Sequence, residues 1–408
     1  MITLTDAVRE KIHSLPASEL PAYIYDLDAL RDHAERVRTL LPDRVELYYA
    51  AKANPEPEIL AALGQIVDGY EVSSGGELAH VAKAVPGRPL AFGGPGKTHA
   101  ELIAALDHGV HRVHVESVAE LRMLAEMTAD RGLDTAIGVL LRVNPPLGGA
   151  ALAASALAMG GRPTPFGLDP AQADIAAAML AGGHCPGLRW EGVHAHLASG
   201  LEAADLVAVA ESVVRWSVAL AGRHGAELTE INLGGGMNVD YTTPGARFDW
   251  VTYAAGLGHI ATAHPGLRLR IEPGRALTAY CGWYVTEVLD VKPSHGREFA
   301  VVRGGTHHLR TPAAKGHDQP CAVVPVETWQ HEWPRPASSG PVVTVCGQLC
   351  TPKDVLASCV PVQRLRAQDR VAFGLAGAYA WNISHHDFLM HPPPGFHIVG
   401  GARRGEDT

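Results

Sequence analysis

The chain has 408 residues, too many for one ordinary core, so a large α/β domain with a smaller partner is the expected organisation. Hydrophobic residues make up 47% and charged residues 19%, a balance typical of a chain that folds completely. The formal net charge of -9 argues against binding to nucleic acid or to an anionic membrane, because both need a basic face, and it favours a small-molecule partner.

The first residues, Met1–Leu15, mix charged and apolar side chains, unlike the uninterrupted apolar region of a signal peptide. No stretch of the sequence approaches the about 18 apolar residues that a membrane-spanning helix needs. The six cysteines are scattered and form no Cys-x-x-Cys pair, so free thiols are expected. These features predict a soluble cytoplasmic protein.

Eight short apolar or β-branched runs alternate with amphipathic stretches in the middle of the chain. The runs are Val45–Ala50, Val67–Val72, Pro89–Phe92, Arg112–Val115, Ala136–Val143, Glu191–Leu197, Glu230–Leu233 and Leu267–Ile271. Each run but the last precedes a plausible helix, such as Val118–Ala129 or Ala203–Arg223. Eight successive units of this kind predict a parallel (β/α)₈ barrel of the TIM type.

The ends of these runs are polar and rich in glycine, which matters because such barrels place their chemistry at the carboxyl ends of the strands. In chain order these residues are Lys52 and Asn54; Ser73, Ser74, Gly75 and Gly76; Gly93 and Gly94; Glu116 and Ser117; Arg142 and Asn144; His196 and Ser199; Gly234, Gly235 and Gly236; and Glu272, Gly274 and Arg275. We therefore expect an active-site rim here. The irregular stretch Pro145–Asp169 lies beside it and is expected to form a mobile loop.

After Arg275 the helical alternation fades and β-like segments separated by prolines begin. These segments are Trp283–Val291, Phe299–Val302, Val342–Val345 and Arg370–Phe373. The early run Ala22–Tyr25 is expected to join them, because an isolated strand needs partners for its backbone groups. The predicted fold is thus α/β, with a barrel over residues 28–276 and a second, mainly β domain formed by residues 1–27 and 277–408.

Lys52 lies in the segment Tyr48-Tyr49-Ala50-Ala51-Lys52-Ala53-Asn54, at the end of the first barrel strand. A surface lysine that ends a strand is the simplest interpretation. However, the apolar and aromatic approach would desolvate the amine and favour the neutral nucleophile that a Schiff base requires.

Two glycine-containing turns, Gly234–Gly236 and Gly274-Arg275, follow the last two strands, where barrels commonly bind phosphate through backbone N–H groups. A glycine triplet alone more often marks a tight turn. Val239 stands where a G-x-G-x-x-G dinucleotide fingerprint would need glycine, which argues against a nicotinamide enzyme.

Glu272 ends an apolar strand, where a buried carboxylate needs a cationic partner. A protonated pyridine nitrogen would serve, and a salt bridge to Arg275 or Arg142 is the alternative. His194 and His196 alternate along the sixth run, so both rings are expected on one face. We expect no metal, because further ligands with suitable spacing are missing, and stacking of a histidine on an aromatic cofactor fits better.

Together these residues resemble the fold-type III pyridoxal-phosphate decarboxylases, the family of the diaminopimelate, ornithine and arginine decarboxylases. The resemblance rests on Pro21-Ala22-Tyr23-Ile24-Tyr25-Asp26-Leu27, Tyr49-Ala50-Ala51-Lys52-Ala53-Asn54, Ser74-Gly75-Gly76-Glu77-Leu78, His194-Ala195-His196-Leu197-Ala198-Ser199, Gly234-Gly235-Gly236, Glu272-Pro273-Gly274-Arg275, Cys346-Gly347-Gln348-Leu349-Cys350 and Gly377-Ala378-Tyr379. The joint order of these elements, which spans nearly the whole chain, is highly specific.

The resemblance implies that pyridoxal 5'-phosphate (PLP) is bound to Lys52, with His196 stacked on its ring and Glu272 at its pyridinium nitrogen. It further implies that the other cofactor-binding residues are Arg142, Ser199, Gly234, Gly235, Gly236, Gly274, Arg275 and Tyr379. Cys350 would reach across a homodimer and donate a proton to the substrate's α-carbon, so that active sites are shared between subunits.

The chain departs from the family after Cys350. Thr351 stands where decarboxylases of basic amino acids have an acid for the distal ammonium group. The tail 382–392 looks like the branch of carboxylate siderophore biosynthesis, in which the substrate is an amino acid joined to citrate. Arg310, Thr351 and His386 are the expected substrate contacts, since citryl carboxylates prefer cations.

Three alternatives remain at this stage. Decarboxylation of free diaminopimelate or another free amino acid is the first. An amino-acid racemase is disfavoured by Glu272, because a fully protonated ring favours decarboxylation. A non-catalytic homologue is disfavoured because both Lys52 and Cys350 are present.

Overall fold

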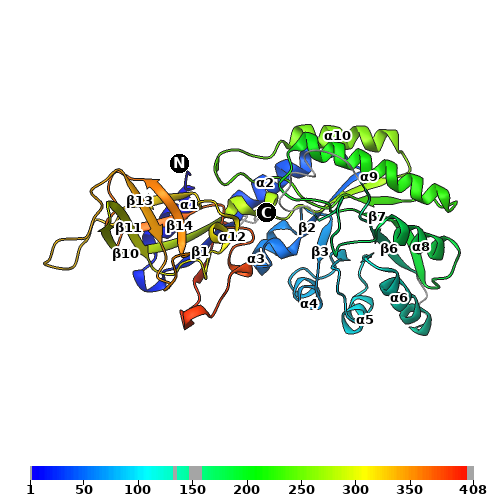
Figure 1. Ribbon diagram of the computed structural model, residues 1–408, viewed down its shortest axis with the longest axis horizontal. Coiled ribbons are helices and arrows are strands. Elements are labelled where there is room, and N and C mark those ends of the chain that lie inside the picture. Colours follow the sequence, from blue (N-terminus) through cyan, green and yellow to red (C-terminus); the bar gives the residue numbers. More distant parts are fainter. Residues whose placement is uncertain (1, 132–135, 147–158, 402–408) are drawn as a thin grey trace, which may run out of the picture. The chain divides into compact units, whose positions relative to one another are not determined.

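The computed structural model describes residues 2–131, 136–146 and 159–401 (Figure 1). The chain divides into two units. The β unit consists of Met1–Asp32, Val239–Arg247 and Leu277–Thr408, and the barrel unit consists of His33–Asn238 and Phe248–Ala276. The domain limits expected from the sequence, with the barrel over residues 28–276, remain a prediction.

The barrel unit contains eight parallel strands that close on themselves. They are β2 Val45–Ala50, β3 Gly69–Val72, β4 Leu90–Phe92, β5 Arg112–Val115, β6 Ile137–Arg142, β7 Leu188–His194, β8 Glu230–Asn232 and β9 Arg268–Ile271. Strand β2 pairs in parallel with β9, Val45 opposite Leu269, which completes the ring. The predicted (β/α)₈ barrel is confirmed. Two strands match their predicted runs, and the other six differ at their ends.

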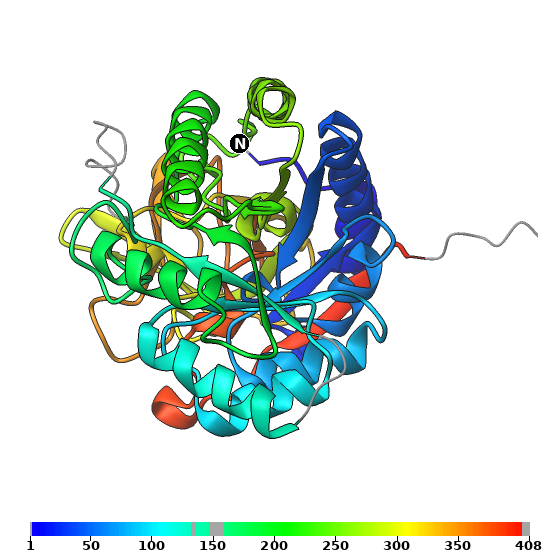
Figure 2. The ribbon, with the colours of Figure 1, turned by 90° about the vertical axis from the view of Figure 1, so that its right-hand side faces the viewer.

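Helices surround these strands, as Figure 2 shows. They are α2 Leu27–Leu40, α3 Pro57–Leu63, α4 Gly75–Ala84, α5 His99–Asp107, α6 Val118–Arg131, α8 Pro170–Ala181, α9 Ala203–Arg223, α10 Trp250–Ala263 and α11 Arg275–Thr278. Local sequence fixes where several of them begin. Helix α5 starts with a capping box between Thr98 and Glu101, and Ser74 caps α4. These caps satisfy backbone N–H groups at the rim of the barrel.

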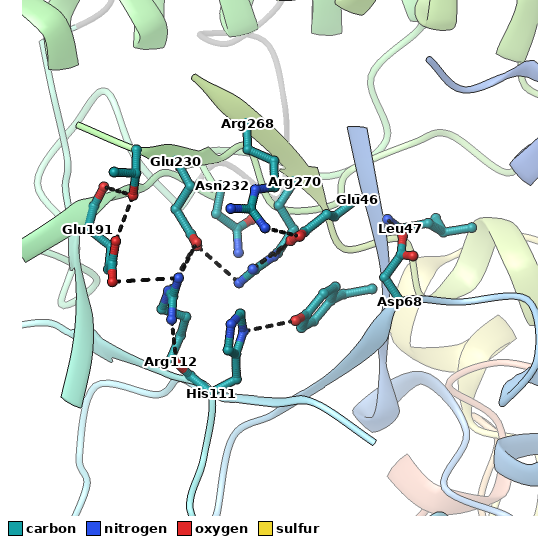
Figure 3. A network of polar contacts seen from close by, with 12 residues as sticks. Glu46, Leu47, Asp68, His111, Arg112, Glu191, Glu230, Asn232, Arg268 and Arg270 are labelled. Carbon is teal, nitrogen blue, oxygen red and sulfur yellow. Dashed lines mark hydrogen bonds and ion pairs between the residues drawn. The ribbon is translucent and has the colours of Figure 1, made fainter. Parts of the chain in front are cut away.

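The amino ends of the strands carry a buried network of ion pairs, drawn in Figure 3. Its charged members are Glu46, Arg112, Glu191, Glu230, Arg268 and Arg270. Arg270, with no exposed surface, lies 2.6 Å from Oε2 of Glu46 and 3.2 Å from Oε1 of Glu230. Arg112 lies 2.8 Å from Oε2 of Glu230. The network is at the opposite strand ends from the polar rim, which indicates a role in stability.

We expect Glu230→Gln to lower the free energy of unfolding by about 3–5 kcal/mol, because it removes a buried acidic partner from both arginines and leaves Arg270 with Glu46 alone and Arg112 with the more distant Glu191. Arg268→Gln is the matched control. The Arg268 side chain is 49% exposed, so its loss should cost about 0–1 kcal/mol. Urea denaturation of both variants checks this, and equal destabilisation by the two would contradict it.

The β unit is built around an eight-stranded sheet. Its strands are β1 Ala22–Asp26, β10 Gly282–Ser294, β11 Arg297–Val302, β12 Cys321–Val324, β13 Val342–Cys346, β14 Val355–Pro361, β15 Arg370–Phe373 and β16 Gly395–Val399. Strand β1 pairs with β10 and β16, which confirms that the early strand joins this sheet. Three strands were missed from the sequence, namely β12, β14 and β16.

Helix α1, Asp6–Ser14, packs on the sheet of the β unit through Val8 and Ile12. The remaining short helices among the described residues are α12 Thr311–Lys315, η1 Ala17–Glu19, η2 Ala51–Ala53, η3 Ala279–Cys281, η4 Trp381–Ile383 and η5 Phe388–Met390. Among the described residues, no helix has the length and apolar character needed to cross a membrane. Residues 147–158 of the predicted mobile loop Pro145–Asp169 lie outside the described residues.

Candidate active site

The structure divides the predicted site residues between the two units. The barrel unit holds Lys52, Arg142, His196, Ser199, Gly234, Gly235, Gly236, Glu272, Gly274 and Arg275. The β unit holds Arg310, Cys350, Thr351, Tyr379 and His386.

Lys52 lies in the short helix η2, directly after strand β2. Its Nζ is 2.5 Å from Oε2 of Glu71, a residue of the neighbouring strand β3 that is 4% exposed. The Oγ of Ser73 donates a hydrogen bond of 2.8 Å to the other carboxylate oxygen of Glu71. The sequence predicted an apolar surrounding for the amine, whereas the structure shows an ion pair that orients it. Glu71 was missed, although an acid within the apolar strand Gly69–Val72 was a visible signal.

The Gly234–Gly236 turn packs against His196 beyond the ends of β7 and β8. Gly234 has φ +67°, and a Cβ there would lie 2.6 Å from the Cβ of His196, so only glycine fits. The N–H of Gly235 donates a 3.1 Å hydrogen bond to Nδ1 of His196. Desolvation, together with the charges of Lys52 and Arg142, holds the pKa of His196 well below its ordinary value. A neutral ring with a fixed orientation results.

Glu272 follows β9 and is almost completely buried. Its N–H donates to the carbonyl of Gly234 over 2.8 Å, which ties it to the glycine turn. Nδ2 of Asn232 donates to Oε1 over 2.6 Å, and Nε2 of His194 lies 3.2 Å from Oε2. In the described part of the chain, no lysine or arginine forms an ion pair with this carboxylate. The position is therefore ready for a cationic group from a ligand.

Two stacked histidines lie behind Glu272. The rings of His194 and His114 are 4.2 Å apart and inclined by 12°. Burial lowers the pKa of both rings well below the ordinary value, so each is neutral and His194 can donate Nε2–H to the carboxylate. Strand β7 ends at His194, so the predicted alternation does not extend to His196. His114 and Asn232 were missed, although each is a polar residue in an apolar strand.

The same three groups could in principle hold a metal ion, since one ligand atom from each of His114, His194 and Glu272 lies within 4.8 Å of the others. A shared ion needs donors that converge on one point. Here the two rings stack face to face, and both His194 and Asn232 already donate to the carboxylate. We therefore interpret the cluster as hydrogen-bonded support for Glu272.

Arg142 ends strand β6 and lies over the ring of Phe166, with Cζ 4.9 Å from the ring centroid. Its NH1 is 2.6 Å from Oε1 of Glu116, and the N–H of Gly167 donates to Oε2 of the same carboxylate over 3.2 Å. Arg142 is therefore engaged by Glu116, and the alternative in which it neutralises Glu272 is not what the structure shows. Glu116 had been placed on the rim without a partner.

His386 and Tyr379, two of the predicted residues of the β unit, have contacts of their own within that unit. The His386 ring stacks on Trp381 at 3.6 Å, and its Nε2 lies 2.6 Å from the Trp381 carbonyl oxygen. Tyr379 has φ +49°, and its carbonyl accepts a hydrogen bond from Thr311. Arg310 and Cys350 are exposed. One face of the His386 ring is thus already occupied.

The groups at the rim of the barrel fit one kind of ligand. They are a partly exposed amine, a carboxylate held by neutral donors, a neutral imidazole and a glycine turn, in which the N–H groups of Gly234 and Gly235 already donate to Asn232 and His196. An aldehyde reacts with the amine, a pyridinium nitrogen pairs with the carboxylate, an aromatic ring stacks on the imidazole, and a phosphate can approach the turn closely because glycine has no side chain. The fold and this donor set define a barrel enzyme that holds PLP.

A family model described as "Pyridoxal-dependent decarboxylase, pyridoxal binding domain" matches residues 27–279. The chain belongs to this family, and it is therefore a PLP-dependent decarboxylase, a carboxy-lyase that acts on an amino-acid-type substrate.

Three relatives illustrate the range of the family. The chain is 38% identical over 405 residues to 2-[(L-alanin-3-ylcarbamoyl)methyl]-2-hydroxybutanedioate decarboxylase of Staphylococcus aureus, covering 98% of this chain and 99% of that protein. It is 32% identical to L-glutamyl-[BtrI acyl-carrier protein] decarboxylase of Niallia circulans, covering 92% and 88%. It is also 32% identical to diaminopimelate decarboxylase of Actinosynnema pretiosum, covering 96% and 88%.

Solved structures share the fold. Diaminopimelate decarboxylase of Helicobacter pylori, complexed with L-lysine, superimposes with a TM-score of 0.83 at 23% identity, covering 96% of this chain and 93% of that one. Lysine/ornithine decarboxylase of Vibrio vulnificus, complexed with putrescine, gives 0.78 at 20% identity, covering 98% and 99%.

Proposed function

We propose that the protein is a homodimeric cytoplasmic enzyme that decarboxylates an amino acid joined to citrate, in the biosynthesis of a carboxylate siderophore. The observation that carries this proposal is the 38% identity, over nearly the full length of both chains, to the S. aureus decarboxylase. The name of that relative describes an L-alanine unit joined through an amide to a hydroxy-dicarboxylate.

Thr351 supports the choice of substrate. An acid after Cys350 would attract the distal ammonium group of diaminopimelate-like or lysine-like substrates, whereas it would repel citryl carboxylates. Thr351 is uncharged, its N–H donates to the carbonyl of Leu349 over 2.8 Å, and Arg310 of the same unit is exposed. A conjugate with several carboxylates suits these residues better than a free diamino acid.

In the barrel unit, Lys52 would hold the cofactor covalently and Glu71 would orient its amine. Glu272 would pair with the ring nitrogen, His196 would stack on the ring, and Ser199, Arg275 and the glycine turn would bind the phosphate. When bound, PLP supplies an electron-accepting ring for the electron pair that carbon dioxide leaves behind.

The reaction breaks the bond between the α-carbon and its carboxylate, and carbon dioxide leaves without the electron pair. Cys350 would then donate the proton of its thiol to the α-carbon, which forms the new C–H bond and leaves a thiolate that regains a proton from water. The protein would contribute orientation, by holding the substrate so that the bond to the carboxylate is the one that breaks.

Glu272 and its donors also support decarboxylation rather than racemisation. Asn232 and His194 both donate to the carboxylate, which fixes its orientation so that it would pair with a protonated ring nitrogen. Such a ring withdraws electrons strongly, which favours loss of carbon dioxide.

The substrate class can be tested by incubating the purified PLP-loaded protein with citryl-diaminopropionate, O-citryl-serine, free diaminopimelate and lysine, each in turn. We expect product masses that show the loss of carbon dioxide from a citryl conjugate, with kcat/KM at least about a hundredfold above that for the free amino acids. Thr351→Glu should reduce turnover of the conjugate by repulsion, while Thr351→Gln, which adds similar bulk without charge, serves as the control. Preferential turnover of diaminopimelate or lysine would overturn the substrate assignment.

A further inference from the structure

Asp354 of the β unit is a buried carboxylate with an unusual set of partners. It lies directly before β14 and is 3% exposed. Among the described residues, it forms no ion pair. Its Oδ1 accepts hydrogen bonds from N–H and Oγ1 of Thr306, over 2.6 and 2.8 Å, and its Oδ2 accepts one of 2.8 Å from the N–H of Leu349. A buried charge of this kind is costly and is retained only where its hydrogen bonds are satisfied.

These bonds join two turns that are distant in the sequence. One contains Gly304–Thr306, and the other contains Gly347–Cys350. The N–H of Gln348 donates to the carbonyl of Gly304 over 2.8 Å, and the N–H of Gly304 donates to Oε1 of Gln348 over 2.9 Å. The N–H of Gly347 donates to the backbone carbonyl of Asp354 over 3.0 Å. The two turns are therefore clamped together, with Asp354 between them.

The approach of the carboxylate to these amides depends on glycine at two positions. A Cβ at Gly347 would lie 2.2 Å from Oδ2 of Asp354, and a Cβ at Gly305 would lie 2.6 Å from both oxygens. Any side chain at Gly347 must therefore push the carboxylate away from the Leu349 amide. The sequence pattern Cys346-Gly347-Gln348-Leu349-Cys350 thus has a physical reason at its glycine.

Cys350 follows Leu349 directly, and it is exposed. A proton donor must be held close to the atom that it protonates, since a displacement of about 1 Å can cost about a hundredfold in rate. Within its own chain the thiol is exposed, so the main chain of its turn is what the subunit can hold in place. Asp354 holds the turn through its hydrogen bond with the N–H of Leu349, the residue before Cys350.

We propose that Asp354 is the positioning residue of Cys350: its carboxylate fixes the turn that presents the thiol to the substrate's α-carbon. This inference rests on the proposed role of Cys350 as the proton donor. Asparagine cannot replace the carboxylate. Thr306 presents two donors to Oδ1 and Leu349 presents one to Oδ2, so the single carbonyl oxygen of asparagine is held at Thr306 and its NH₂ group faces the N–H of Leu349.

The test compares Asp354→Asn and Gly347→Ala with Thr306→Val. The first two remove the bond to the Leu349 amide by different routes, and the third removes only the hydroxyl bond on the other side of the carboxylate. Hydrogen exchange of the PLP-free protein should show the Leu349 amide exchanging at least about tenfold faster in the first two variants, with β13 and β14 unchanged. Thr306→Val should leave that amide protected.

In the PLP-loaded enzyme, Asp354→Asn and Gly347→Ala should lower kcat by about ten- to hundredfold with KM nearly constant. Turnover in D₂O should place deuterium on the α-carbon of the product. We expect a single configuration at that carbon with the wild type and both configurations with these variants. A purely structural role of Asp354 would not change this stereochemistry.

Unchanged exchange at Leu349 in Asp354→Asn, or a single product configuration at wild-type kcat, would overturn the inference. The inference would also be overturned if Thr306→Val changed the exchange at Leu349 and kcat as much as Asp354→Asn does. The proposed role of the thiol is tested separately, because full activity of Cys350→Ala would reject that role whatever the exchange at Leu349 shows.

Discussion

Replacement of Lys52 by alanine should give a folded protein that shows no absorption band of covalently bound PLP and turns over on the order of 10³-fold more slowly or worse. We expect this because of where Lys52 lies. Lys52 is the lysine at the end of the first barrel strand, its amine is partly exposed, and Glu71 orients it at the rim that also carries Glu272. A Schiff base needs a primary amine, and alanine has none.

Two control variants show whether the absorption band is lost because the Schiff base cannot form or because a positive charge has been removed. Lys52→Arg keeps a cation beside Glu71 but cannot form the Schiff base, so it should lose the band as alanine does. Lys83→Ala removes an exposed lysine at the end of α4 and should keep both band and activity. Borohydride reduction followed by peptide mass analysis should place the cofactor on the peptide that contains Lys52. A retained band in Lys52→Ala would refute the attachment site.

Replacement of Cys350 by alanine should lower kcat by about 10²- to 10⁴-fold and leave the absorption band of bound PLP intact. The thiol lies on an exposed turn of the β unit, and the residues expected to attach the cofactor lie in the barrel unit. Loss of the proton donor should therefore affect turnover without affecting cofactor binding. Cys359→Ala, which removes the other exposed cysteine, is the matched control and should be fully active. A normal rate in Cys350→Ala would rule out the proton-donor role.

The same two variants test the shared active site of the proposed homodimer. If Cys350 of one subunit completes the site that holds Lys52 of the other, a mixed dimer of Lys52→Ala and Cys350→Ala has one site with both residues intact. Random exchange of subunits in an equal mixture should then restore about a quarter of the wild-type activity. If both residues of a site come from one subunit, the mixture should stay as inactive as its components.

Much of the fold could be predicted from local pattern. The eight apolar runs identified the barrel strands, because strands buried on both faces read as continuous apolar segments. Helix α9 agreed with the predicted Ala203–Arg223, and β15 agreed with Arg370–Phe373. Candidate site residues followed from one rule, that such barrels carry their chemistry at the carboxyl ends of the strands. Lys52 and Glu272 were found in this way, and their roles remain predictions.

Other features depended on pairing between distant residues, which no local pattern contains. The contacts of Lys52 with Glu71 and of Arg142 with Glu116 join different strands and were not foreseen. Strand β16 pairs in parallel with β1 across nearly the whole chain, and its short run has no distinctive pattern of its own.

The sequence by itself determined the order of the elements and the chemistry available at each strand end, because helix caps, apolar runs and polar end residues act over a few neighbouring positions. Only the tertiary structure decided which of these groups meet. Glu272 is held by Asn232 and His194 because closure of the barrel brings β7, β8 and β9 side by side, and Asp354 reaches Thr306 because the sheet brings two remote turns together. Buried polar groups must find partners wherever the fold places them, so their pairing is a property of the folded chain.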